Sequence, residues 1–127
     1  PVLDFKRNGD ELDGRLAIMW TGKAHDTPGM ADLERDYGRI AESGAVAREG
    51  VLAGDLHVLA EGVGIYYDGQ LAEGMEPLRD LPGAIARKYC GGGHGGYALY
   101  LFADPADRTS AIAAEAELQA IEPVCKV

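Results

Sequence analysis

Six consecutive residues late in the chain, 91–96, contain five glycines, and a nearly unbroken apolar run follows them directly. Glycine adopts positive φ readily and leaves the backbone open to close approach. The run that follows, Tyr97–Ala103, is rich in the aromatic and aliphatic side chains that favour a strand. The segment therefore predicts either a tight turn that leads into a strand or a loop whose bare backbone contacts a ligand. Neither a P-loop nor a Rossmann fingerprint is present, because the glycines lead into a strand and no Gly-Lys-Ser/Thr follows.

Helical periodicity dominates the first half of the chain. Apolar or small residues recur at steps of three and four over Ala31–Ala53, which predicts a helix, and Thr27 and Pro28 are suited to begin it. Gly54 suits the position after its end and Asp55 the N-cap of a second helix, whose apolar stripe runs from residue 56 to 67. The two segments together predict a helical hairpin.

Strand patterns flank this hairpin and recur in the second half. A short helix is expected from Pro82, and an alanine-rich helix from Pro105 to about Gln119. Four strands are expected, over Arg15–Trp20, Arg87–Cys90, Tyr97–Ala103 and Ile121–Val127. This order predicts an α+β fold with a mostly antiparallel four-stranded sheet and helices packed on one face.

The chain is acidic, with a formal net charge of −9 over 127 residues, the length of a single domain. Such a field repels phosphate backbones and anionic lipid head groups, which argues against nucleic acid and membranes as partners. A local anion site remains compatible with this charge, because backbone N–H groups at a glycine turn attract phosphate.

The cysteine content indicates a reducing compartment. Cys90 and Cys125 are the two cysteines, without a C-x-x-C pattern or a histidine at ligand spacing, so no disulfide framework and no metal site are expected. No signal peptide or stretch of 18 apolar residues is present. We therefore expect a cytoplasmic protein with buried thiols. Pro1 in place of methionine suggests processing, or a piece of a longer protein.

A wider window carries a more specific signal. The segment GAIARKYCGGGHGGYALYLF reads as Gly-Ala-x-x-x-Lys-x-x-Gly-x-Gly-x-Gly-Gly, then an aromatic residue and an apolar strand. It resembles the C-terminal motif of the GHMP small-molecule kinases, which include galactokinase, homoserine kinase, mevalonate kinase and the heptose and fucose kinases. The matching positions are Gly83, Ala84, Lys88, Gly91, Gly93, Gly95, Gly96 and Tyr97. The flanks RLAIMWTGK and AREGVLAGDLHVLAEGV look like the sugar-kinase branch, so the resemblance covers about Leu12–Val127.

The resemblance implies the ferredoxin-like C-terminal domain of an ATP-dependent sugar kinase. In that family, ATP and Mg²⁺ are bound mainly by an N-terminal domain that has no counterpart in this chain. That domain is the implied partner, and the chain alone is expected to be inactive, with no catalytic residue or metal ligand of its own. The implied site, close to the substrate and the transferring phosphoryl group, comprises Gly91, Gly92, Gly93, His94, Gly95 and Gly96, with Lys88 as a candidate substrate contact.

Two positions depart from the family pattern, because Gly92 and His94 stand where the family usually has alanine and glycine. A side chain at 94 either contacts the substrate as a phosphate-facing donor or lies exposed in the turn. Lys88 is as compatible with a surface charge as with a site role. One alternative is a free-standing ligand-binding or assembly module with the kinase half-fold and no catalysis. Another alternative is that the glycine loop forms a tight hairpin and contacts no ligand. The sequence leaves the acceptor and the oligomeric state open.

Other polar and aromatic residues receive structural interpretations. His25 and Asp26 follow the first strand and are expected to be solvated rather than to line the cleft. Tyr66 and Tyr67 form an aromatic pair on the second helix, where core packing is the expected role.

Overall fold

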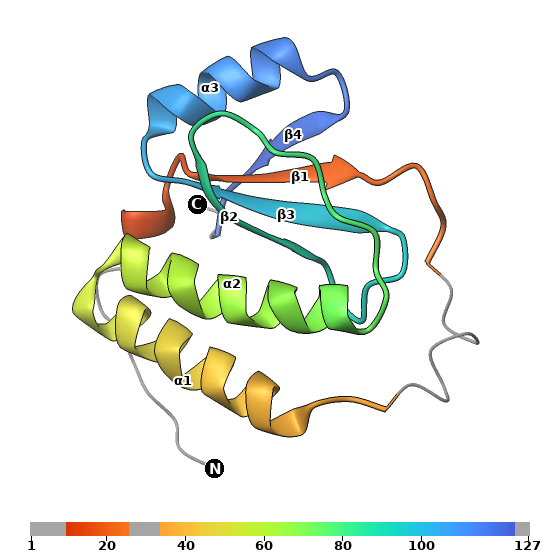
Figure 1. The fold of residues 1–127 in the computed structure, drawn as a ribbon. Coiled ribbons are helices and arrows are strands. Elements are labelled where there is room, and N and C mark those ends of the chain that lie inside the picture. Colours follow the sequence, from red (N-terminus) through yellow and green to blue (C-terminus); the bar gives the residue numbers. More distant parts are fainter. Residues whose placement is uncertain (1–9, 26–33, 124–127) are drawn as a thin grey trace.

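The computed structural model describes residues 10–25 and 34–123 of the chain (Figure 1). A short 3-10 helix precedes the first strand, and a helical hairpin separates that strand from the second. The elements in chain order are η1 (Asp10–Leu12), β1 (Leu16–Trp20), α1 (Tyr37–Ala53), α2 (Leu56–Ala72), β2 (Ala84–Tyr89), β3 (Tyr97–Phe102), α3 (Pro105–Ala114) and β4 (Leu118–Ile121).

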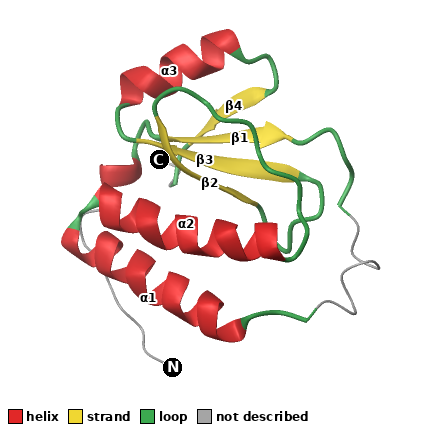
Figure 2. Ribbon diagram, in the orientation of Figure 1, coloured by secondary structure: helices red, strands yellow, loops and turns green. Residues whose placement is uncertain are grey.

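The four strands form one antiparallel sheet in the order β2-β3-β1-β4 (Figure 2). In β1, Ala17 lies opposite Tyr100 of β3, and Tyr100 lies opposite Arg87 of β2 on its other side. The helical hairpin connects β1 to β2, and α3 connects β3 to β4, which is the ferredoxin-like βαββαβ pattern. The predicted α+β class and four-stranded antiparallel sheet are therefore confirmed.

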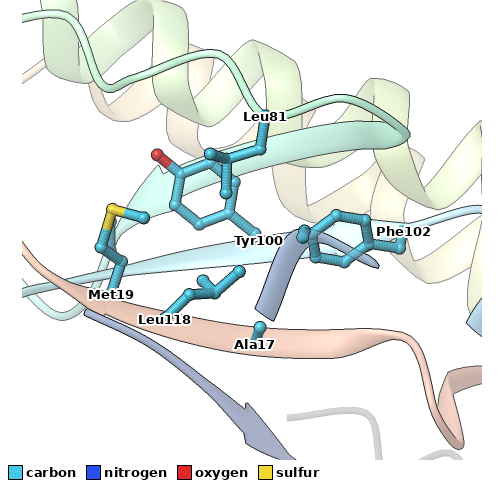
Figure 3. Packing of buried hydrophobic residues seen from close by; sticks show 8 residues of the cluster. Ala17, Met19, Leu81, Tyr100, Phe102 and Leu118 are labelled. Carbon is cyan, nitrogen blue, oxygen red and sulfur yellow. The ribbon is translucent and has the colours of Figure 1, made fainter. Parts of the chain in front are cut away.

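The core lies on the face of the sheet that α3 and the segment between α2 and β2 cover. Tyr100 and Phe102 of β3 are fully buried. They pack with Met19 of β1, with Leu81 from the segment between α2 and β2, and with Ala111 of α3 (Figure 3). Alternation along each strand directs these side chains to the same face. Residues from β1, from the segment between α2 and β2 and from α3 thus meet on this face of the sheet.

Local signals set the turn between the two helices of the hairpin as predicted. Gly54 adopts the left-handed conformation (φ 68°) at the end of α1, and the Asp55 carboxylate caps α2 by accepting from the His57 and Val58 N–H groups. Two internal glycines allow the helices to touch. A Cβ on Gly50 would lie 2.3 Å from the nitrogen of Leu59. The equivalent atom on Gly62 would lie 2.5 Å from the nitrogen of Ala47.

Two predicted helix boundaries were wrong. Helix α1 begins at Tyr37 rather than Ala31, because the Asp36 carboxylate accepts from the Arg39 N–H and caps the helix there. The caps predicted at Thr27 and Pro28 lie outside the described residues. Helix α3 ends at Ala114 instead of reaching Gln119.

The last strand begins earlier than predicted. Leu118 is 3% exposed and pairs with Met19, so burial of its side chain in the core outweighs the helix propensity of the alanine-rich segment. Strand β4 therefore covers Leu118–Ile121, whereas the predicted strand over Ile121–Val127 extends beyond the described residues.

The short helix predicted from Pro82 does not form. Gly83 has φ +82°, and a Cβ there would lie 2.5 Å from the Cβ of Asp107 in α3. This left-handed residue turns the chain directly into β2, which begins at Ala84 rather than at Arg87. The close approach of the turn to α3 explains why glycine is required at position 83.

Candidate functional site

The glycine loop, residues 91–96, connects the adjacent strands β2 and β3. Its backbone adopts positive φ at Gly91, Gly93, Gly95 and Gly96, and also at His94, where φ is +55°. A non-glycine residue in this conformation is uncommon and costs conformational energy. The cluster of glycines is therefore used for its conformational freedom.

Two of these glycines are also confined by their neighbours. A Cβ on Gly93 would lie 2.4 Å from the sulfur of Met75, and one on Gly95 would lie 2.3 Å from the carbonyl oxygen of Ala24. Gly91, in contrast, has open space on that side. The middle of the loop is thus packed against two other segments of the chain, while its first residue is not.

The segment that follows β1, Thr21–His25, holds the loop by hydrogen bonds. The N–H and hydroxyl of Thr21 both donate to the Gly96 carbonyl, at 3.0 and 2.7 Å, and the Gly96 N–H donates to the Lys23 carbonyl at 2.7 Å. Nδ1 of His25 lies 2.6 Å from the carbonyl oxygen of Gly93. His25 remains exposed, but the prediction that it is merely solvated was wrong. Asp26 lies outside the described residues.

Several loop N–H groups remain available as donors. Four have no hydrogen-bond partner in the part of the chain that the structure describes: those of Gly91, Gly92, His94 and Gly95. Successive N–H groups in turns with left-handed residues form concave sites that favour anions. The loop can therefore present several donors to an oxyanion.

Two cavities lie beside the glycine loop. Gly92 lines the smaller one, about 170 Å³, together with Arg35 and Arg39 from the region where α1 begins. The larger cavity, about 310 Å³, is bounded by His94 and Gly95 of the loop, by the segment that follows β1 and by the segment that follows α2. Its hydrogen-bonding members include Thr21, Lys23, Glu76 and Tyr89. The loop thus separates two small polar spaces.

His94 lines the larger cavity and is half-buried rather than fully exposed. Its Nε2 atom is inaccessible to solvent and has no hydrogen-bond partner among the described residues. A buried polar atom of this kind is costly unless a water or a ligand satisfies it. His94 is therefore not a fully exposed turn residue, and its contact with a ligand stays a prediction.

Ion pairs surround the loop. Nζ of Lys23 lies 2.5 Å from a carboxylate oxygen of Glu76, and this hydrogen bond raises the pKa of the lysine. Arg35 lies 3.8 Å from the Glu73 carboxylate, and its guanidinium donates to the Gly92 carbonyl at 3.4 Å. These pairs neutralise much of the local charge, so an anion at the loop would depend largely on backbone donors.

The structure places Lys88 on β2 with its ammonium 4.8 Å from the centroid of the Tyr66 ring. This cation–π contact ties the lysine to α2, and its substrate role remains a prediction. Tyr67 has the core role that was predicted, because it is 8% exposed and its hydroxyl accepts from the Leu78 N–H. Burial raises the pKa of the Cys90 thiol, so it is protonated at neutral pH.

The described residues offer neither a metal-binding cluster nor a membrane-spanning helix. They contain no cluster of three or more His, Cys, Asp and Glu side chains that could hold a metal ion. No helix within them is long and apolar enough to cross a membrane.

Comparison with known proteins identifies the fold. No model of a known protein family matches the sequence, and no curated protein matches it. Among solved structures, the chain resembles L. major mevalonate kinase, solved in complex with R-mevalonate, with a TM-score of 0.60 and 22% sequence identity. The match covers 80% of this chain but 38% of the kinase. The fold of this chain is therefore shared with a part, somewhat over a third, of a mevalonate kinase.

Proposed function

We propose that this chain is the C-terminal domain of a GHMP-type, ATP-dependent small-molecule kinase, most similar to the sugar-kinase branch. The observation that carries the proposal is the glycine loop, in a fold shared with part of a mevalonate kinase. Four of its N–H groups have no partner among the described residues. The sequence motif over Gly83–Tyr97 supports the same family. The whole of residues 1–127 would act as one domain.

Phosphoryl transfer depends on positioning and on electrostatic stabilisation of the transferred group. In the proposed enzyme, the loop residues 91–96 approach the phosphoryl group and its acceptor with bare backbone. Their N–H groups donate to oxygens on which negative charge develops. Gly95 cannot be replaced without moving Ala24, so this wall is held at a fixed position.

An N-terminal domain is the proposed partner and would hold most of the ATP and Mg²⁺. The described residues supply hydrogen-bond donors at the loop, which is the share of the site that this proposal assigns to the chain. Mg²⁺ prefers carboxylate and phosphate oxygens. When bound, it supplies charge neutralisation between the phosphates. The chain would therefore complete a site of which it forms one wall, in the cytoplasm where ATP is available.

The proposed acceptor is a sugar. The larger cavity presents a hydroxyl from Thr21, the imidazole of His94 and the side chains of Lys23 and Glu76 within about 310 Å³. Such a lining offers both donors and acceptors, which suits a small polyhydroxylated molecule. Of the proposed site residues, His94 and Gly95 line this cavity and would lie nearest to the acceptor. Gly91, Gly92, Gly93 and Lys88 would lie farther from it, towards the phosphoryl group.

The test is an assay of the complete gene product for ATP-dependent phosphorylation of a panel of monosaccharides, with the isolated 127-residue chain assayed in parallel. We expect activity in the complete product and none in the chain alone. Gly95→Ala should abolish activity, whereas Gly91→Ala, at the open end of the loop, should retain most of it. Phosphorylation by the isolated chain, or equal activity of the two variants, would refute the proposed role of the loop.

A second candidate function is ligand binding or assembly without catalysis. His94 favours it, because its side chain occupies a loop position where the kinases usually have glycine. A complete gene product that binds a sugar by calorimetry but transfers no phosphate from ATP would support this alternative. Binding together with turnover would exclude it.

A further inference from the structure

The peptide group between Gly93 and His94 has one partner in the described part of the chain. Its carbonyl oxygen lies 2.6 Å from Nδ1 of His25, while its N–H group has no partner. The C=O and N–H of a trans peptide point in opposite directions. A contact that fixes the carbonyl therefore also fixes the direction of the His94 N–H.

The conformation of His94 needs such a constraint. It is the one described residue other than glycine with positive φ, at +55°. Residues in this region persist when their surroundings over-determine them. His25 contacts the carbonyl immediately before the strained residue, and Thr21 holds the carbonyl of Gly96 two residues after it. The strained residue is thus held on both sides.

The hydrogen bond also defines the tautomer of His25. A carbonyl oxygen accepts but cannot donate, so Nδ1 must carry the proton. Nε2 has no partner among the described residues and is the unprotonated nitrogen of the neutral ring. His57 provides an internal comparison, because it is exposed at the start of α2 and its ring has no such partner in the described chain.

We propose that His25 is a positioning residue of the glycine loop, which holds the Gly93–His94 peptide so that the His94 N–H faces the bound ligand. The ligand is an oxyanion, in the first place phosphate, and in this respect the inference rests on the proposed function. A hydrogen bond to the carbonyl also polarises the peptide and strengthens its N–H as a donor. His25 acts through the loop and need not touch the ligand.

The first test is the tautomer of His25 in the uniformly ¹⁵N-labelled chain, measured by long-range ¹H–¹⁵N NMR at a pH where the rings are neutral. We expect a protonated Nδ1 at His25 and a different tautomer balance at His57. A His25 ring protonated at Nε2, or one that averages as His57 does, would overturn the proposal. This measurement needs no variant and no ligand.

The second test uses two substitutions of similar size. His25→Asn places an amide N–H near the position of Nδ1, whereas His25→Gln places it near that of Nε2. The His94 amide ¹⁵N resonance responds to hydrogen bonding at the carbonyl of the same peptide. We expect it to move in His25→Gln and to stay close to wild type in His25→Asn, with His57→Asn as the control. Equal shifts in both His25 variants would contradict positioning through Nδ1.

Inorganic phosphate is the ligand probe, titrated into each protein while the amide resonances of His94 and Gly95 are followed. We expect about tenfold weaker binding in His25→Gln, as for loss of one hydrogen bond, and less than about threefold weakening in His25→Asn. Equal weakening would overturn the inference. If wild type shows no phosphate-dependent shifts, the proposed function loses support, while the tautomer and the His94 resonance still decide whether His25 orients the peptide.

Discussion

Gly95 packs against Ala24 so closely that a Cβ on the glycine would lie 2.3 Å from the alanine carbonyl oxygen. The two residues are far apart in the sequence, and their contact joins the segment after β1 to the glycine loop. Together with the hydrogen bonds of Thr21 and His25, it makes the loop a rigid part of the domain. Rigid donors cost little reorganisation when charge develops on a ligand.

The first prediction compares two glycines with positive φ. Gly95→Ala introduces both a left-handed alanine and a clash with Ala24, and should lower the free energy of unfolding by about 3 kcal/mol. Gly91→Ala introduces the backbone strain alone and should cost about 1 kcal/mol. Urea unfolding measures both values. Equal losses would show that Ala24 does not confine the loop.

At position 94, the strained backbone should make a glycine variant more stable than an alanine variant, the reverse of the usual order. Glycine usually destabilises a protein relative to alanine, because it loses more conformational entropy on folding. At a residue with φ +55°, alanine is strained and glycine is not. His94→Gly should therefore unfold at a higher urea concentration than His94→Ala, with a difference of about 1 kcal/mol. Both variants lack the imidazole, so the comparison isolates the backbone. Greater stability of His94→Ala would mean that the loop relaxes out of the left-handed region.

Local signals in the sequence predicted the elements whose ends are set by neighbouring residues. Gly54 and Asp55 separate α1 from α2, and Pro105 begins α3, as the local pattern indicated. The wrong predictions concern ends that distant contacts determine. Leu118 ends the alanine-rich segment because it pairs with Met19, about a hundred residues earlier.

In the candidate site, too, the sequence predicted the local feature but not the distant contacts. The glycine loop was evident from its composition, but the residues that hold it were not identified. Thr21, His25 and Met75 contact the loop from segments remote in the sequence. The motif TGK, residues 21–23, carried no local signal for these contacts. Their identification required the register of β1 with β3, which brings Trp20 opposite Tyr97 and so places residue 21 beside the end of the loop.

The carboxylate of Glu122 gives a prediction for acidic pH. It accepts from the Gly14 N–H at 2.9 Å and from Arg108 at 2.8 Å, and these hydrogen bonds lower its pKa, that of Gly14 most. Because the pKa of Glu122 is lower in the folded than in the unfolded chain, the carboxylate stabilises the fold at pH values above its pKa in the unfolded chain. This contribution is lost as the pH falls through the pKa of the folded chain.

Glu122→Gln should therefore be less stable than wild type near pH 7, and the difference should shrink below about pH 4.3, the usual range of a glutamate. Urea unfolding at pH 7 and pH 3 measures the difference. Glu61→Gln serves as the control, because Glu61 is exposed and makes no hydrogen bond in the described chain. A difference that stays constant with pH would show that the Gly14 and Arg108 contacts do not favour the ionised carboxylate.

The hydroxyl of Tyr100 gives the corresponding prediction at alkaline pH. It is buried in the core and donates to the Arg79 carbonyl at 2.8 Å, and burial raises its pKa to about 12. Tyr100→Phe leaves that carbonyl without its partner and should cost about 1 to 2 kcal/mol at neutral pH.

Above pH 10 the unfolded chain releases the phenolic proton of Tyr100 while the folded chain retains it, so wild type loses stability with rising pH. The phenylalanine variant lacks this loss, and the gap between the two proteins should close between about pH 10 and pH 12. Urea midpoints over this range, with the exposed Tyr37→Phe as control, measure the convergence. A constant gap would mean that Tyr100 ionises at the same pH in the folded and unfolded chains, and that its burial does not favour the neutral phenol.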